Sequence, residues 1–222
     1  MFKRLLSYFV PVNIYQKKST LSKTLEISWN NGQLVLDSLN TNYSYGSLQR
    51  ILRIGLQSIG YDIVRNMQHI LVLGVAGGSV IKTLTGEIGY NGRITGVEID
   101  PEIIKIANEY FGLDEIPNLE IVIDDAFEFV LKATLRYDLI IIDIFQDTAM
   151  PNFLFEGFFA SHVSGLLTNR GYILFNTMIL NENHESRNKQ YIAEYNPANF
   201  DVRTIPRLEN HNEVIVVQKR AE

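Results

Sequence analysis

Apolar residues in this chain fall into short continuous runs that alternate with segments in which apolar side chains recur at helical spacing. Five runs after residue 65 are rich in Ile, Val and Leu: 69–75, 93–99, 119–125, 137–144 and 171–177. Strands that are apolar nearly throughout are covered on both faces, as in a parallel sheet. The segments between the runs predict helices near 78–88, 101–111, 126–134 and 153–167, so the chain alternates strand and helix.

The two ends of the chain follow other patterns. Segments 200–207 and 213–219 alternate and are joined by a short polar loop, so we expect them to be antiparallel neighbours. Near the start, 24–29 and 33–38 flank Asn30-Asn31-Gly32, which is typical of a hairpin turn. We therefore expect a small N-terminal β-hairpin appendage over residues 1–45, and a main domain over 46–222 that opens with a linking helix over 46–66.

Composition narrows the classes of function. The 222 residues are 46% hydrophobic, which is enough for one full core with a small appendage. A net charge of −5 argues against a nucleic-acid partner, and the absence of cysteine excludes disulfides and thiolate metal sites. The four histidines are scattered, and no apolar run is long enough to span a membrane. We expect a cytoplasmic protein with no metal, no nucleic acid and no membrane segment.

Residues 71–79 are the most informative segment, because an apolar run ends there in small residues and a helical pattern follows at once. About twenty residues later a second run ends at Glu98, the spacing seen where a nucleoside binds. Glu98 can accept hydrogen bonds from ribose hydroxyls, and small residues let backbone N–H groups approach the ligand; these are Gly74, Ala76, Gly77 and Gly78. A nicotinamide-dinucleotide site would need glycine at Ala76 and Ser79, so a dehydrogenase is disfavoured.

Two further segments, Asp124-Asp125-Ala126-Phe127-Glu128-Phe129 and Tyr137-Asp138-Leu139-Ile140-Ile141-Ile142-Asp143, extend this pattern. Together with the glycine turn and Val97-Glu98-Ile99-Asp100, they resemble the spermidine synthases, which are polyamine aminopropyltransferases of the S-adenosylmethionine-dependent methyltransferase superfamily. The resemblance covers roughly residues 45 to 220. It implies an α/β fold with a Rossmann-like, seven-stranded methyltransferase-type sheet whose last strand is antiparallel.

The resemblance also implies roles for single residues. Glu98, with Ile99 beside it, would hold the ribose, and Asp125 would accept from the adenine amino group with Ala126 near the ring. Asp143 would lie at the reaction centre, outside the carboxyl end of the fourth strand of the Rossmann-like domain, where ligands of open parallel sheets bind. There it could take a proton from the acceptor, with Asp147 as an auxiliary.

The chain departs from the family pattern at the positions that would hold a diamine. Gly77 stands where the family carries an aspartate, Gln146 replaces a second acidic residue, and Ile51 falls in an upstream segment that has lost its glutamate and histidines. Charge-assisted hydrogen bonds contribute roughly 1.5–3 kcal/mol each, so such losses weaken diamine binding by orders of magnitude unless Asp147 or Asp124 substitutes.

Plainer interpretations stay open for these residues. Glu98 and Asp143 could be acids at strand ends, Asp147 a turn residue and Asp125 a helix cap. Four aromatic residues at near-helical spacing favour core packing over a stacking platform: Phe153, Phe155, Phe158 and Phe159. Residues 181–188 are polar and indicate a solvated loop and the start of a helix.

We therefore interpret the chain as a transferase that uses S-adenosylmethionine, or its decarboxylated form, as co-substrate. It would move a methyl or aminopropyl group to a small acceptor such as an amine. The alternatives are a true spermidine synthase and a non-catalytic protein that binds an adenosyl nucleoside. The predicted hairpin exposes Leu34, Val35 and Leu36 and is too small to be stable alone, so we expect it to pack on a second copy in a homodimer.

Overall fold

The computed structural model describes residues 2–19, 21, 23–38, 42–44, 47–145 and 149–221. The helices are α1 (Phe2–Leu6), α2 (Ser47–Ile59), α3 (Tyr61–Arg65), α4 (Ser79–Lys82), α5 (Pro101–Phe111), α6 (Ala126–Lys132), α7 (Gly157–Gly165) and α8 (Glu182–Ala193), with a π-helical turn η1 (Thr83–Ile88) and a 3-10 turn η2 (Asn152–Phe155). The strands are β1 (Val12–Ser19), β2 (Lys23–Asn30), β3 (Gln33–Ser38), β4 (Asn42–Ser44), β5 (His69–Leu73), β6 (Arg93–Glu98), β7 (Leu119–Ile123), β8 (Tyr137–Ile142), β9 (Leu167–Met178), β10 (Phe200–Leu208) and β11 (Asn212–Lys219). The domain boundary predicted at residues 45 and 46 falls outside the described residues.

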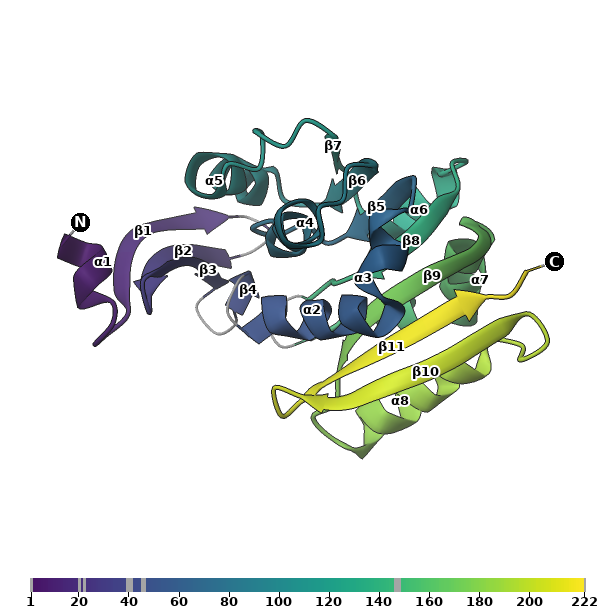
Figure 1. Cartoon of the computed structure of the whole chain (residues 1–222). Helices are drawn as coiled ribbons and strands as arrows, with labels where there is room; N and C mark the ends of the chain where they lie inside the picture. Colours follow the sequence, from purple (N-terminus) through teal and green to yellow (C-terminus); the bar gives the residue numbers. More distant parts are fainter. Residues whose placement is uncertain are drawn as a thin grey trace.

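Seven strands form the larger sheet in the order β10-β11-β9-β8-β5-β6-β7. The pairs from β9 to β7 are parallel, whereas β11 runs antiparallel to both β9 and β10. The last strand of the chain is thus inserted between β9 and β10, with Val214 opposite Asn176. This arrangement confirms the predicted seven-stranded sheet with an antiparallel last strand (Figure 1).

Both faces of this sheet are covered, which explains why its central strands are apolar throughout. Alternate residues of β5 enter two different hydrophobic clusters. Ile70 and Val72 pack with residues of α2, α3 and α4, and Leu71 and Leu73 pack with residues of α6, α7 and α8. All four side chains are fully buried.

The helix that follows β6 begins and ends as its sequence predicts. Pro101 occupies the first turn of α5, and the Asp100 carboxylate caps it by accepting from the Glu102 backbone N–H at 2.9 Å. Gly112 ends the helix in the left-handed conformation, with φ 58°.

The helix predicted over 78–88 is divided into α4 and the π-helical turn η1. The Thr83 and Thr85 hydroxyls donate to the carbonyl oxygens of Ser79 and Ile81, at 3.1 and 3.0 Å. These hydroxyls add a second donor to carbonyl oxygens of the preceding turn, as Ser and Thr side chains commonly do within helices.

The aromatic residues of 153–159 are core residues with one exception. Phe159 is fully buried, and Phe153 and Phe155 pack against the same cluster. Phe158 is 56% exposed and lies beside His162, with ring centroids 4.2 Å apart, so the prediction of core packing is wrong for this residue.

Residues 182–188 form the first half of α8, which Asn181 caps by accepting from the His184 backbone N–H.

The predicted hairpin of β2 and β3 is present and belongs to a four-stranded antiparallel sheet in the order β1-β2-β3-β4. Asn31 and Gly32 form its turn with φ 47° and 76°. One face of this sheet packs on α5 of the same chain, through Leu25, Ile27 and Leu36 on the sheet and Ile103, Ile106 and Phe111 on the helix. The prediction that the hairpin exposes its apolar residues is therefore wrong, because Val35 and Leu36 are 5% and 0% exposed within the single chain; the homodimer stays a prediction. Among the described residues no helix is long and apolar enough to cross a membrane.

Replacing Leu36 by Ala tests whether the small sheet is stabilised within the chain. Leu36 is fully buried, so we expect the substitution to lower the free energy of unfolding by about 2–5 kcal/mol, as for other buried leucines. Urea unfolding measures this loss. The control is Leu21→Ala, at a side chain that is 55% exposed, which should cost less than about 0.5 kcal/mol. Equal effects of the two substitutions would contradict the packing described here.

Candidate active site

A tight turn joins β5 to α4 at the carboxyl edge of the larger sheet. Gly74, Ala76 and Gly78 in this turn have positive φ angles of 88°, 47° and 77°. At Gly74 a Cβ atom would lie 2.3 Å from the backbone oxygen of Asp143, so only glycine fits where the ends of β5 and β8 meet. Alanine in the left-handed region costs roughly 1–2 kcal/mol, a strain that is typical of functional turns.

The carboxylate of Glu98 holds this turn. Glu98 is the last residue of β6 and is only 7% exposed. Its Oε2 accepts from the backbone N–H groups of Val75 and Ala76, at 3.2 and 3.0 Å, and its Oε1 accepts from that of Asp100 at 3.1 Å. Burial raises the pKa of Glu98, and the three backbone donors oppose that rise. A carboxylate has about four acceptor positions, so these three bonds do not use all of them, and a bond from a ribose hydroxyl stays a prediction.

Asp125 follows β7, the next strand of the sheet, and caps α6. Its Oδ1 accepts from the backbone N–H groups of Phe127 and Glu128, at 2.8 and 3.3 Å. The plainer interpretation of Asp125 as a helix cap is therefore correct. A contact of its second oxygen with adenine stays a prediction, as does one with Ala126, which is half-buried at the start of the same helix.

The small sheet reaches the same edge through β1. The Ser19 hydroxyl donates to Oδ2 of Asp100 at 2.5 Å, and Lys17 forms an ion pair with Glu102. Both contacts lie within four residues of Glu98. Ile99, between Glu98 and Asp100, is 42% exposed, so its side chain is accessible to a ligand there.

Asp143 directly follows β8 and is half-buried. The side-chain amide of Asn176, on β9, donates to its Oδ1 at 2.9 Å. Burial raises the pKa of Asp143 to about 6, although the Asn176 hydrogen bond lowers it. A carboxyl group with this pKa is mostly ionised at pH 7 and can accept a proton.

The strand order thus brings together most of the residues that the sequence singles out. Consecutive strands β8, β5, β6 and β7 carry, at one edge, Asp143, the glycine turn with Gly77, Glu98 with Ile99, and Asp125 with Ala126. Asp147 and Gln146 lie outside the described residues. Sequence reasoning missed Asn176, although a polar residue ending the apolar run of β9 is a usable signal.

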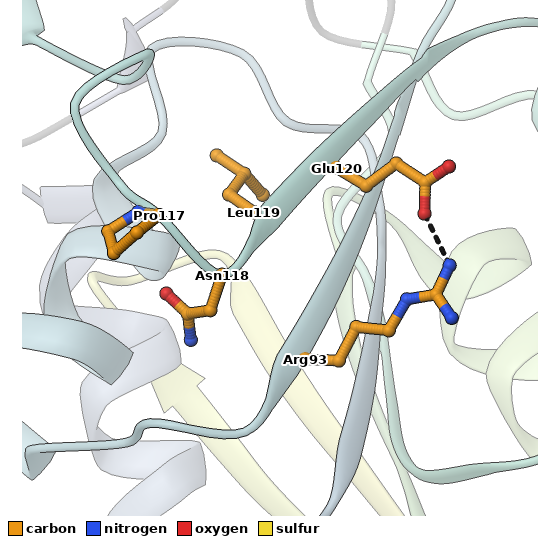
Figure 2. A pocket seen from close by; sticks show the side chains of 5 residues that line it. All are labelled: Arg93, Pro117, Asn118, Leu119 and Glu120. Atoms are coloured by element: carbon orange, nitrogen blue, oxygen red, sulfur yellow. Dashed lines mark hydrogen bonds and ion pairs between the residues drawn. The ribbon is translucent and has the colours of Figure 1, made fainter.

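The opposite edge of the sheet carries a separate depression of about 310 Å³. It is lined by Arg93, Pro117, Asn118, Leu119 and Glu120, and an ion pair of 2.6 Å joins Arg93 to Glu120 (Figure 2). It lies at the amino ends of β6 and β7, whereas ligands of open parallel sheets bind at the carboxyl ends.

Within the described part of the chain, no three His, Asp or Glu side chains are grouped to hold a metal ion.

Comparison with known proteins agrees with this geometry. Residues 51–222 match the family described as the spermine/spermidine synthase domain. A polyamine aminopropyltransferase of Vibrio vulnificus is 32% identical over 124 residues, which are 54% of this chain and 41% of that protein. An eEF1A lysine and N-terminal methyltransferase homolog of Drosophila melanogaster is 31% identical over 98 residues, 39% of this chain and 14% of that protein.

The fold is also that of solved relatives. A spermidine synthase in complex with the transition-state analogue AdoDATO superposes with a TM-score of 0.70 at 19% identity, over 95% of this chain and 75% of that one. At this identity the likeness shows a shared fold alone. The chain spans less than half the length of the two relatives matched by sequence.

Replacing Asp143 by Asn tests the environment of this carboxyl group. Its pKa of about 6 lies above the value of about 3.9 for an unfolded chain, so the folded protein binds this proton more tightly. The resulting stabilisation is present below about pH 4 and is lost as the pH rises through 6. We expect Asp143→Asn to exceed the wild type in stability at pH 8 by up to about 3 kcal/mol, and by much less at pH 4.

Urea unfolding at pH 4, 6 and 8 measures this difference. Asp62→Asn is the control for the change of an aspartate to asparagine, because the side chain of Asp62 is 90% exposed. An Asp143→Asn variant that is less stable than the wild type at pH 8 as well as at pH 4 would contradict the assignment of a costly buried carboxylate.

Proposed function

Since the chain belongs to the spermine/spermidine synthase domain family, we propose that it is a transferase that moves a methyl group from S-adenosylmethionine to a small acceptor. The observation that carries the choice of methyl transfer is Gly77 in the turn between β5 and α4. Transfer of an aminopropyl group is the second candidate, because the Vibrio vulnificus relative is named a polyamine aminopropyltransferase.

The edge formed by β5, β6 and β7 offers the contacts that an adenosyl group needs. Glu98 supplies a buried acceptor for the ribose, and Asp125 and Ala126 flank the start of α6 where the adenine would lie. Because Ala76 and Gly78 are held at positive φ, the turn takes a conformation that lets backbone approach a ligand closely. These features support binding of the nucleoside common to both donors.

Gly77 is the residue that distinguishes between the two possible donors, S-adenosylmethionine and its decarboxylated form. S-adenosylmethionine carries a carboxylate on its amino-acid end, and decarboxylated S-adenosylmethionine lacks it. An aspartate at this position would repel that carboxylate and attract the amino group of the decarboxylated donor. Gly77 places no charge there, so the turn favours neither a diamine nor the decarboxylated donor and leaves room for the complete amino acid.

Asp143 is suited to take the proton that the acceptor releases. In methyl transfer the acceptor nitrogen or oxygen forms a bond to the methyl carbon while the carbon–sulfur bond breaks, and the electron pair of that bond goes to sulfur. The acceptor then loses one proton. With a pKa of about 6, Asp143 is about nine-tenths ionised at pH 7 and can receive this proton.

The remaining requirement is alignment, because the sulfonium already makes the methyl carbon electrophilic. Gly74 brings the backbone at Asp143 against the turn, so a base just after β8 and a donor held just after β5 would lie side by side. We propose that the acceptor is a small molecule and that amines are the first class to test. We also propose that the protein is a homodimer. A non-catalytic nucleoside-binding protein is the remaining alternative.

An assay of both donors tests this proposal. We expect methyl transfer from S-adenosylmethionine to a member of a panel of amines and hydroxy compounds, and poor turnover of decarboxylated S-adenosylmethionine with putrescine. Asp143→Asn should reduce kcat by roughly 10²–10⁴-fold with near-normal nucleoside affinity, whereas the exposed control Asp62→Asn should leave kcat unchanged. Efficient spermidine formation would overturn the argument from Gly77. Tight nucleoside binding without turnover of either donor would favour the non-catalytic alternative.

A further inference from the structure

Two asparagines are buried at the edge of the larger sheet beside Asp143. Asn176, near the end of β9, is fully buried, and Asn212, at the start of β11, is 7% exposed. Their neighbours Leu174 and Val214 belong to the hydrophobic core, and a buried amide is costly unless its donors and acceptors are paired. Their retention at this place therefore needs a reason.

The two amides form a directed chain of hydrogen bonds that ends on Asp143. Nδ2 of Asn212 donates to Oδ1 of Asn176 at 3.0 Å, and Nδ2 of Asn176 donates to Oδ1 of Asp143 at 2.9 Å. The direction is set at the Asp143 end, because an ionised carboxylate can only accept. Asn176 must present its nitrogen to Asp143, and Asn212 keeps it in this orientation by donating to its oxygen.

We propose that Asn176 and Asn212 are positioning residues that hold the Asp143 carboxylate in one rotamer, with one oxygen tied and the other available to the acceptor. The inference rests on the proposed function in one respect, that Asp143 is the proton acceptor. Asn212 does this without touching Asp143, from a strand that lies two positions away in the sheet.

The nearby charged side chains Glu98 and Glu213 are hydrogen-bonded elsewhere, so they do not hold the Asp143 carboxylate. Glu98, two strands away at the same edge, is bonded to the glycine turn. Glu213 follows Asn212 on β11 and so points to the opposite face, where it accepts from Asn188 at 2.8 Å. Among the described residues, the hydrogen bond from Asn176 is what lowers the pKa of Asp143 against the effect of burial.

The chain of amides predicts an effect at a distance. In Asn212→Leu the amide of Asn176 loses the donor that holds its oxygen, so it can turn that oxygen toward Asp143. An oxygen facing Asp143 is satisfied only when Asp143 is protonated, so its pKa should rise. Asn176→Leu removes the donor directly and should raise the same pKa.

Carbon-13 NMR of the aspartate side-chain carboxyl groups tests the proposal with no substrate present. The Asp143 signal is identified by its loss in Asp143→Asn, and its titration midpoint is then compared among variants. We expect a midpoint near 6 in the wild type, a rise of at least about one unit, or tenfold in proton affinity, in Asn176→Leu, and a smaller rise in Asn212→Leu. Circular dichroism verifies that each variant is folded, and Asn176→Ala replaces Asn176→Leu if leucine does not fit.

Asn188→Leu is the matched control, because Asn188 is a buried amide beside the same strand ends but donates to Thr177 and Glu213 on the other face. It should leave the Asp143 midpoint unchanged. Midpoints that stay near 6 in folded Asn176 and Asn212 variants would overturn the proposal. A midpoint that rises as much in Asn188→Leu would overturn it also, since it would reflect general loosening of this edge.

The result is independent of whether the transferase activity is found. If turnover is measured, the acidic limb of kcat/KM should move to higher pH together with the NMR midpoint, and loss of rate in Asn176→Leu should be recovered at high pH. An acidic limb that stays in place would overturn the positioning role and leave the proposed transferase intact. If neither donor is turned over, a raised midpoint still supports the amide chain while the proposed function fails.

Discussion

The site depends on the hydrogen bonds that the buried carboxylate of Glu98 accepts. Two come from backbone N–H groups of the turn after β5, and one comes from that of Asp100, the residue that caps α5. These bonds hold a turn with alanine at positive φ, and they offset the cost of burying the carboxylate. Without Glu98, the N–H groups of Val75 and Ala76 would lose their acceptor, and the turn would lose the constraint that shapes it for a ligand.

The strand order divides the candidate site into two halves. Strands β5, β6 and β7 carry the glycine turn, Glu98 and Asp125 of the proposed nucleoside half, whereas β8, β9 and β11 carry Asp143 and the amides behind it. The two halves meet at Gly74, where the backbones of β5 and β8 approach too closely for any side chain. The small N-terminal sheet is joined to the nucleoside half through Ser19 and Asp100, and it shares a core with α5.

Much of this could be predicted because the signals are local. The apolar runs predict the parallel strands, Asp100 and Pro101 predict the start of α5, and the spacing from the turn to Glu98 places that acid beside the turn. Strand β1 was missed because its burial follows no clean alternation. Most of α8 was missed because it is polar on nearly all sides, so its helix depends on the Asn181 cap and on the buried Asn188 and Tyr191.

The hydrogen-bonded chain of Asn212, Asn176 and Asp143 could not be predicted from the sequence for another reason. Asn176 is 33 residues from Asp143 and 36 from Asn212, and the pairing of β9 with both β8 and β11 brings the three together. The role of Asp125 stayed open because a helix cap and a ligand acceptor require the same residue at the same place.

Calorimetric titration of S-adenosylmethionine into the wild type and two variants tests the central claim most directly. Glu98→Gln keeps the shape of the side chain but removes its charge, and Glu120→Gln makes the same change at the opposite edge of the sheet, where Glu120 pairs with Arg93. We predict that affinity falls by roughly 10- to 150-fold in Glu98→Gln, equivalent to about 1.5–3 kcal/mol, and is unchanged in Glu120→Gln. Unchanged affinity in Glu98→Gln, or an equal loss in both variants, would contradict the placement of the nucleoside at Glu98.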